Sequence, residues 1–454
     1  MEKFEKINVT ELRDKAADHI WIPFLPVAEH KNSNYVNIWA SGEGCRITDI
    51  EGRSYLDGFS GLMYKAVGYG RKEIVDAAFN QMLELESSAQ FDVATIPAIE
   101  LAARLAKITP GELSRTFFVC GGSEANEVAV KTAKHYQRLS GFGNRYKIIA
   151  RSGEYSGFTH MTMALGRLNG TIHSPFEPLA SGTRHIPQPY CYRCPLGLEY
   201  PSCGVACAGE LERVILEEGP ELVAALLTTS ISQQTTAAIP PPEYWPMIRD
   251  ICDKYGVLLI DDEVVCGFGR TGKMFGMENF GIVPDIMTVA KSLTSGYLPL
   301  GACITSSKIS EKFEEKQDVF RNVTTFGGLP GCCAASLANL DIIEDEGLVQ
   351  NAQDMGLYIS ERLELLREHP MVGDVRGIGL FWGIEIVKDK KSKEKLTLLE
   401  AGNLKAKLKE GGLLTRVDEG IIRFMPPLVI SKEEVDEGLS IIDKAISHFE
   451  KEMM

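Results

Sequence analysis

Apolar, strand-like runs alternate with helical patterns through the middle of this chain, and this alternation constrains the fold more than any other feature. The runs are rich in β-branched and aromatic residues, and they lie at 115–120, 147–150, 222–228, 257–260 and 286–290. Parallel strands joined by crossover helices are buried on both faces, which accounts for such continuous apolar runs. The sequence therefore predicts an α/β fold with a mostly parallel sheet between two layers of helices.

The chain is long enough to predict more than one domain. Its 454 residues exceed what one hydrophobic core usually organises. After residue 330 the alternation gives way to long helical stretches at 332–369 and 393–411, typical of a smaller α+β domain. We place the boundaries near 60 and 330, which gives an N-terminal segment packing with the small domain (1–60), a large domain (61–330) and a small C-terminal domain (331–454).

Charge and composition exclude several classes of binding partner. The net charge of −14 argues against nucleic acid or an anionic membrane surface as the main partner. No apolar run is long enough to span a membrane, and the charged N-terminus is unlike a secretion signal, so we expect a cytoplasmic protein. The 11 cysteines are then expected to be reduced thiols.

Cys191, Cys194, Cys203 and Cys207 are close together in the sequence. The first pair has the spacing of zinc ligands, and the second pair fits known zinc patterns only loosely. The four cysteines either bind structural zinc or are reduced thiols in a Pro-rich surface segment. The sequence does not decide between these alternatives, and we assign no metal.

A possible anion site follows the first strand. Gly121, Gly122 and Ser123 lie between that strand and a helical pattern. Glycines allow a close approach of the backbone, and a helix N-terminus attracts a phosphate. The alternative is an ordinary turn with Ser123 as the helix N-cap.

Charged residues follow two later strands. Asp261, Asp262 and Glu263 come after the run at 257–260, and Lys291 follows the run at 286–290. Ligands bind beyond the carboxyl ends of parallel strands, and a carboxylate buried there needs a partner, although one or two of the acids would fit a solvated loop start. A lysine at such a place either reaches the surface or is desolvated, and desolvation suits it to form a Schiff base.

The order and spacing of these segments resemble the class III (omega) aminotransferases, which are pyridoxal 5'-phosphate (PLP) enzymes of fold type I. Within that family the chain is most similar to omega-amino acid:pyruvate aminotransferases. The most specific stretches are VLLIDDEVVCGFGRTGKMFG (257–276) and PDIMTVAKSLTSGYLPLGA (284–302). The resemblance implies a seven-stranded sheet in the large domain, PLP as cofactor, and a homodimer with active sites at its interface. Further association into a tetramer stays open.

The resemblance also implies roles for single residues around the cofactor ring. Lys291 would form the Schiff base with PLP and then move the proton, and Asp262 would pair with the pyridine nitrogen and keep it protonated. Val264 and Tyr155 would pack on the two faces of the ring.

Other matches concern the phosphate and the substrate. Gly122 and Ser123 would hold the phosphate, to which Thr325 would donate across a dimer interface. Arg416 and Arg423 match arginines that bind substrate carboxylates, and arginine suits this because its donors can clamp both oxygens. The substrate pocket would be lined by Phe24, Leu62, Met63 and Phe91.

Several positions depart from the family pattern. Thr229-Ser230 replaces Glu-Pro, Ser156 replaces a histidine, and Leu329 replaces another. The lost glutamate removes a charge near the ring. Met63 stands where a tryptophan is frequent, and Asp92 either favours a second cationic group on the substrate or is simply solvated.

The predicted activity is transfer of an amino group from an omega-amino acid or amine to a keto acid such as pyruvate. Taurine, β-alanine, 4-aminobutyrate, diamines and arylalkylamines all stay open as donors, and 2-oxoglutarate stays open as acceptor. The alternatives are a racemase, decarboxylase or aminomutase on the same scaffold, and a catalytically idle homologue. A keto product that forms only when a keto acid is added distinguishes transamination from the other PLP reactions.

Overall fold

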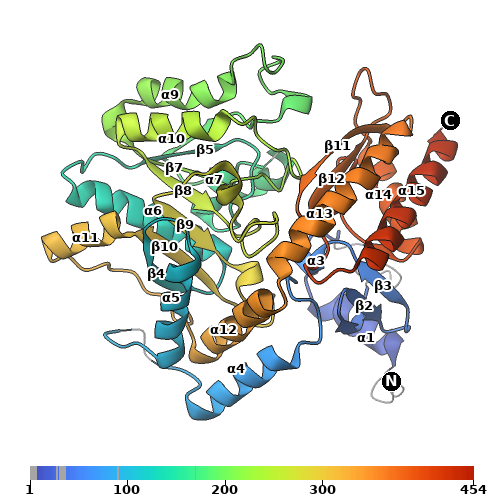
Figure 1. Ribbon diagram of the computed structural model, residues 1–454, viewed down its shortest axis with the longest axis horizontal. Coiled ribbons are helices and arrows are strands. Elements are labelled where there is room, and N and C mark those ends of the chain that lie inside the picture. The colour runs from blue at the N-terminus through green and yellow to red at the C-terminus, as the bar shows by residue number, and fades with distance from the viewer. Residues whose placement is uncertain (1–7, 27–28, 30–36, 89–90, 169, 454) are drawn as a thin grey trace.

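The apolar runs in the middle of the chain form the strands of one seven-stranded sheet (Figure 1). The computed structural model describes residues 8–26, 29, 37–88, 91–168 and 170–453. Across the sheet the order is β4 (Leu113–Val119), β10 (Gly301–Ser306), β9 (Ile286–Val289), β8 (Leu258–Asp262), β7 (Val223–Thr228), β5 (Lys147–Arg151) and β6 (Thr183–Ile186). β10 runs antiparallel to both neighbours, while the strands from β9 to β6 pair in parallel. The predicted α/β fold with a mostly parallel sheet is confirmed.

Helices cover both faces of this sheet (Figure 1). One face carries α6 (Gly122–Leu139) and α11 (Ser307–Lys316), and the other carries α9 (Ala206–Glu218) and α10 (Tyr244–Tyr255). The shorter α7 (His160–Gly166) and α8 (Gly170–His173) follow β5. α10 ends where Gly256 adopts a φ of 63°, a left-handed conformation that glycine tolerates without strain.

A group of three helices packs beside β4, at the edge of the sheet. These are α4 (Lys72–Glu84), α5 (Ile96–Ile108) and α12 (Pro330–Asp345). The helical stretch predicted at 332–369 is in fact two main helices, α12 and α13 (Leu348–Glu364). Gly347 separates them with a φ of 61°, which interrupts the helical backbone.

Two four-stranded sheets lie at the other end of the molecule. One contains β11 (Val372–Ile378), β12 (Phe381–Ile386), β15 (Ile421–Phe424) and β14 (Val417–Asp418); the other contains β1 (Trp39–Glu43), β2 (Arg46–Asp49), β3 (Ser54–Asp57) and β13 (Leu413–Leu414). The remaining helices are α1 (Val9–His19), α3 (Ser60–Met63), α14 (Leu398–Glu410) and α15 (Lys432–Met453). β13 pairs with β3 in parallel, so the N-terminal hairpin and the C-terminal region share a sheet.

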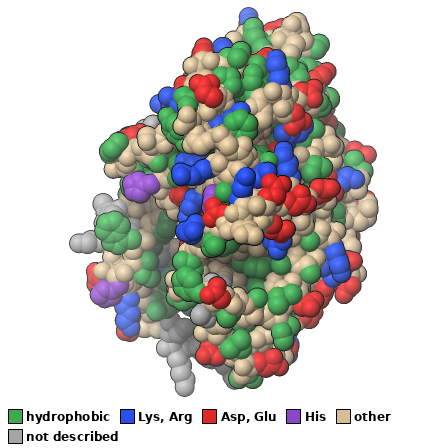
Figure 2. All heavy atoms as spheres, turned by 90° about the vertical axis from the view of Figure 1, so that its left-hand side faces the viewer, with side chains coloured by type: hydrophobic (Ala, Val, Ile, Leu, Met, Phe, Trp, Pro, Cys, Tyr) green, Lys and Arg blue, Asp and Glu red, His purple; other side chains and the backbone are tan. Residues whose placement is uncertain are grey.

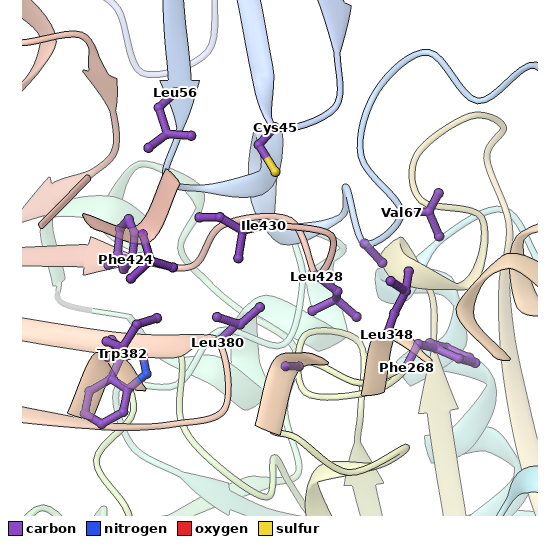
Figure 3. Packing of buried hydrophobic residues seen from close by; sticks show 14 of the residues in the cluster. Cys45, Leu56, Val67, Phe268, Leu348, Leu380, Trp382, Phe424, Leu428 and Ile430 are labelled. Carbon is purple, nitrogen blue, oxygen red and sulfur yellow. The ribbon is translucent and has the colours of Figure 1, made fainter. Parts of the chain in front are cut away.

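One hydrophobic core joins these parts (Figure 3). Leu56 of β3 and Phe424 of β15 belong to it and are fully buried. A Cβ atom added to Gly438 of α15 would meet Phe424 at 3.0 Å and Leu56 at 3.2 Å, so this glycine lets α15 approach both side chains. Side chains that are distant in sequence therefore stabilise one continuous core.

No helix in the described ranges is both long and apolar enough to cross a membrane. The cytoplasmic location and the domain boundaries near 60 and 330 stay predictions.

Replacing Leu56 by Ala is expected to lower the free energy of unfolding by about 2–5 kcal/mol, because it leaves a cavity in this core. The control is Leu357→Ala in α13, since Leu357 is 64% exposed and exposed positions change stability by about 0.5 kcal/mol or less. Urea unfolding of both variants measures the difference. Equal losses would show that Leu56 does not hold the core together.

Candidate active site

A cavity of about 220 Å³ lies where the loops after β4, β5, β7, β8 and β9 meet. The carboxyl ends of parallel strands share one edge of a sheet, so residues far apart in sequence converge there. Six of the residues predicted to contact a cofactor line this single cavity: Gly122, Ser123, Tyr155, Asp262, Val264 and Lys291.

Asp262 is the last residue of β8, and its side chain is enclosed. Its carboxylate accepts hydrogen bonds from the Asn126 side-chain amide at 2.7 Å and from the Val264 backbone N–H at 3.1 Å. Burial raises the pKa of Asp262, while these bonds and the charge of Lys291 oppose the rise. The two donors and the nearby cation favour a negative charge at this point of the cavity.

The neighbouring acids, Asp261 and Glu263, are fully buried. Glu263 accepts hydrogen bonds from the N–H groups of Gly276 at 2.9 Å and Met277 at 2.8 Å. Burial and the nearby Glu263 carboxylate raise the pKa of Asp261 well above its ordinary value. The alternative of a solvated loop start therefore holds for none of the three acids, because the strand continues through Asp262 into a closed turn.

Lys291 lies two residues after the end of β9, with a left-handed φ of 48°. It is half-buried and lines the cavity, and within the described residues its amine makes no hydrogen bond or ion pair. Burial lowers the pKa of Lys291, and the charge of Asp262 opposes this shift. A strained, desolvated and unpaired lysine is therefore presented to the cavity as an amine nucleophile.

The turn before α6 fits an anion. The N-cap of α6 is Gly121 rather than Ser123, whose hydroxyl accepts a hydrogen bond from the Phe158 N–H at 3.2 Å. A Cβ atom on Gly122 would lie 2.9 Å from Val264, so only glycine allows the turn to pack this closely. The free N–H groups of the first helical turn and the positive end of the helix dipole favour a phosphate here.

Aromatic rings extend from the cavity to its outside. Tyr155 lines the cavity, its ring lies 5.4 Å from that of Phe158, and Phe158 lies 6.2 Å from Phe24. The guanidinium of Arg416 lies 5.8 Å from the centre of the Phe24 ring. Arg416 and Phe24 are thus connected to the cavity through other rings and do not line it themselves.

Other predicted site residues lie outside the cavity of the single chain. Phe24, Leu62 and Phe91 are 72%, 48% and 69% exposed, and Thr325 is also exposed. Met63 does not line the cavity but is buried behind it, in an apolar cluster with Phe59, Ile231, Ala237, Val265, Cys266, Phe381 and Met425, of which Val265 lines the cavity. The chain alone therefore brings together the cofactor-ring residues but not the predicted substrate-pocket residues.

Asn126 is a site residue that the sequence analysis missed. It donates to Asp262 and to the Ser156 carbonyl (2.8 Å), and it accepts from the Thr288 hydroxyl (2.7 Å). The only signal in the sequence was a polar residue between Ala125 and Val128 on the apolar face of a helix. Such a residue is buried only when it has partners, and here the partner is the carboxylate in the cavity.

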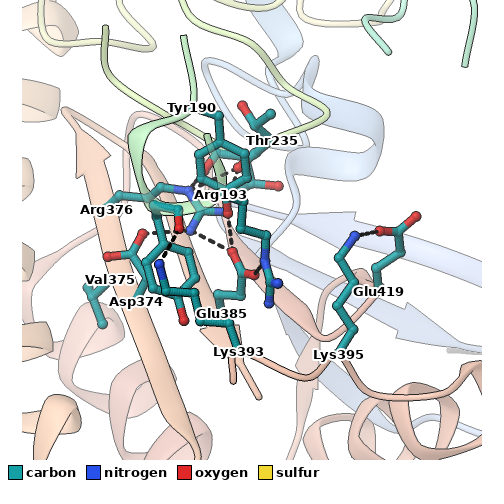
Figure 4. A network of polar contacts seen from close by, with 12 residues as sticks. Tyr190, Arg193, Thr235, Asp374, Val375, Arg376, Glu385, Lys393, Lys395 and Glu419 are labelled. Carbon is teal, nitrogen blue, oxygen red and sulfur yellow. Dashed lines mark hydrogen bonds and ion pairs between the residues drawn. The ribbon is translucent and has the colours of Figure 1, made fainter. Parts of the chain in front are cut away.

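A polar network fixes the loop that follows β7 (Figure 4). Arg376 of β11 donates to the carbonyls of Thr235 and Thr236 at 2.6 and 2.9 Å, and it pairs with Glu385 of β12 at 2.9 Å. Tyr190 also bonds to Glu385. The C-terminal sheet thus holds a loop whose Gln233 lines the cavity.

The four clustered cysteines surround a small cavity of about 20 Å³. Among the residues that the structure describes, no three His, Cys, Asp or Glu side chains are grouped as metal ligands. The zinc alternative gains no support from this arrangement.

Comparison with known proteins gives a consistent result. A family model for class III aminotransferases matches residues 27–446. A probable aminotransferase of Mycobacterium tuberculosis is 42% identical over 96% of this chain and 94% of its own length, and the taurine–pyruvate aminotransferase of Bilophila wadsworthia is 39% identical over 94% and 95%. The crystal structure of an (S)-enantioselective omega-transaminase from Thermomicrobium roseum superposes with a TM-score of 0.92 at 38% identity, covering 98% of this chain and 99% of that one.

Replacing Asn126 by Ala is expected to lower the free energy of unfolding by about 1–3 kcal/mol, because it removes the hydrogen-bond partner of Oδ2 of the buried Asp262 and that of the Thr288 hydroxyl. Asn403→Ala is the control, since Asn403 lies on an exposed position of α14. Calorimetry of both variants tests this expectation. A variant at position 126 as stable as the control would contradict the role of Asn126 in holding the carboxylate.

Replacing Lys291 by Met is expected to raise the free energy of unfolding of the cofactor-free protein at neutral pH by on the order of 1 kcal/mol, because a buried ammonium is removed. Burial lowers the pKa of Lys291 in the folded state. Between the folded and the unfolded pKa, the unfolded chain therefore binds more protons than the folded protein. The free energy of unfolding of the original protein then rises with pH in this range. The advantage of the Met variant should therefore shrink toward pH of about 10.

Urea unfolding at neutral and alkaline pH measures this trend. An advantage that grows with pH would mean that Lys291 is not desolvated in the folded protein.

Proposed function

The chain belongs to the class III aminotransferases, which depend on PLP and act on amines and keto acids, and we propose that it uses an omega-amino acid or related amine as donor and pyruvate as acceptor. The relative from Bilophila wadsworthia acts on taurine and pyruvate, which supports this choice. That relative and the Thermomicrobium roseum structure are both named for transamination, which favours transamination over racemisation, decarboxylation or aminomutation.

One observation carries the proposal: Lys291 and Asp262 face the same cavity, and each charge influences the other. The residues present fit PLP, since the cavity combines an unpaired amine for its aldehyde, a carboxylate for its ring nitrogen and a helix N-terminus for its phosphate. When bound, PLP supplies an electron sink for the electron pair that remains when the substrate carbon loses its proton.

Each residue would contribute one physical effect. Asp262, fixed by Asn126, would pair with the ring nitrogen and favour its protonated form. The lowered pKa of Lys291 leaves more of its amine in the neutral, proton-accepting form at neutral pH, so Nζ would accept the proton from the substrate carbon and return it. Val264 and Tyr155 line the cavity and would hold the ring between them, and Gly122 and Ser123 would hold the phosphate.

The buried pair Arg151 and Glu154 lies beside the position where the family's glutamate is absent. Glu154 accepts from the Thr228 hydroxyl at 3.1 Å and pairs with Arg151 at 2.7 Å. Arg151 also donates to the carbonyl of Thr229, which stands in place of that glutamate. The absence of the family's glutamate at position 229 is therefore compatible with the wall of the cavity, which the buried Arg151–Glu154 pair closes without a net charge.

A homodimer would complete the site. Exposed apolar side chains lie along α4 and α5: Val75, Phe79, Leu83, Ile96 and Ile99. Figure 2 shows one face of the molecule, on which hydrophobic side chains gather around a hollow below mixed charges. Burial of such surface by a second copy would place the exposed Thr325 and Phe91 at a partner's cavity. Sedimentation of the protein at the mass of a single chain would contradict this arrangement.

The function is tested by incubating the protein with PLP, pyruvate and one donor at a time, and measuring alanine and the carbonyl product. Taurine, β-alanine, 4-aminobutyrate, a diamine and an arylalkylamine cover the proposed donors. Alanine and the carbonyl product are expected in equal amounts, and only when pyruvate is present. Lys291→Ala is expected to reduce the rate by at least about a hundredfold, because the base is removed.

The matched control is Lys405→Ala, since Lys405 is an exposed lysine of α14. Product that forms without any keto acid would point to one of the other PLP reactions. PLP that binds without any turnover on these donors would overturn the proposed donor class.

A further inference from the structure

The two arginines proposed to bind a substrate carboxylate already share a carboxylate of the chain itself. β14 and β15 form a hairpin in which the Arg423 N–H bonds to the Arg416 carbonyl at 3.1 Å, so these residues lie opposite each other. Asp418 lies two positions after Arg416. Its side chain lies 3.1 Å from Nε of Arg416 and 2.9 Å from Nη2 of Arg423.

Charge explains why a carboxylate is held there. Arg423 is almost fully buried, and its pKa is lowered to about 10 by burial and by the charges of Arg416 and Arg376, against the effect of Asp418. Gln234 is its other side-chain partner, at 3.3 Å. Buried guanidinium groups of like charge repel each other, so this corner of the protein strongly favours an anion.

The shared carboxylate lies near the reaction cavity. Gln234, which accepts from Arg423, directly follows Gln233, which lines the cavity. On the other side, Arg416 contacts the Phe24 ring, which connects through Phe158 to Tyr155. Arg423 is thus connected to the cavity wall through Gln234 and its neighbour Gln233. Arg416 is connected to it through the aromatic rings.

We propose that Asp418 occupies the carboxylate position of Arg416 and Arg423 and competes there with the carboxylate of the substrate, which sets the preference between acidic and uncharged substrates. This inference rests on the proposed function, because it takes these arginines as the acid-binding site. An acidic substrate binds only after Asp418 has left, so its apparent affinity falls by the fraction of time for which Asp418 occupies the site. An uncharged substrate makes no use of the arginines and is indifferent to Asp418.

Asp418 is able to leave. Its side chain is 31% exposed and that of Arg416 is 41% exposed, so Asp418 can turn into water without becoming a buried, unpaired charge. Arg423 is only 5% exposed and stays in place as the fixed half of the pair. The hairpin therefore combines one fixed arginine, one movable arginine and one displaceable anion.

The test compares two acceptors, pyruvate and butanal, with a single amine donor and the PLP-loaded enzyme. Asp418→Asn keeps the shape of the side chain and removes its charge. Its KM for pyruvate is expected to fall about three- to tenfold, the range expected of a partly exposed ion pair. The ratio kcat/KM for butanal is expected to stay unchanged.

Glu419→Gln is the matched control. It removes a neighbouring charge from the same hairpin, that of Glu419, which pairs with Lys395 (Figure 4). Its KM for both acceptors should equal that of the original protein. Asp418→Glu retains the charge and is expected to preserve the original preference, which protects the test against a folding defect in the Asn variant.

A second measurement does not depend on turnover. Calorimetric titration with propionate, an unreactive carboxylate, is expected to show about three- to tenfold tighter binding to Asp418→Asn than to the Glu419→Gln control. An unchanged or weaker affinity for propionate, or an equal change in KM for pyruvate and butanal, would overturn the role of Asp418. Failure of the proposed function has a different signature, namely no amino transfer to either acceptor by the original protein.

Discussion

The active site depends on two opposite charges, Lys291 and Asp262, that line one cavity at the edge of a sheet. Each charge would be strongly unfavourable in such an enclosed place if it stood alone. Asp262 is stabilised by the amide of Asn126 and by a backbone N–H, whereas the Lys291 amine has only the longer-range attraction of Asp262. This imbalance leaves the lysine reactive, because nothing within the described residues ties up its nitrogen.

The parallel sheet is what allows this arrangement. Successive strands end at one edge, so β8 delivers a carboxylate, β9 a lysine, and β4 the glycine turn that opens α6. None of these groups is close to the others in the sequence. The fold brings them together with rigid strands behind each one, which is the preorganisation that proton transfer requires.

The other end of the molecule carries the residues that we propose to select the substrate. The sheet of β11, β12, β15 and β14 holds the loop of Thr235 through Arg376, and it also carries the hairpin with Arg416, Asp418 and Arg423. The hydrophobic core around Leu56 and Phe424 joins this sheet to the N-terminal strands. The residues proposed to hold the cofactor therefore come from the large sheet, and the residues proposed to discriminate between substrates come from the C-terminal part.

The sequence by itself determined the alternation of strands and helices, and its resemblance to the class III aminotransferases implied PLP as cofactor and the roles of Lys291 and Asp262. It also predicted a glycine turn before a helix, with Ser123 as an alternative N-cap, and the structure has Gly121 at that position. Only the tertiary structure decided that all three acids at 261–263 are buried, that Asn126 holds the carboxylate, and that Asp418 lies between two arginines. The physical reason is that periodicity and spacing report local backbone form and burial, whereas the partner of a charged side chain is chosen by whichever distant segment packs against it.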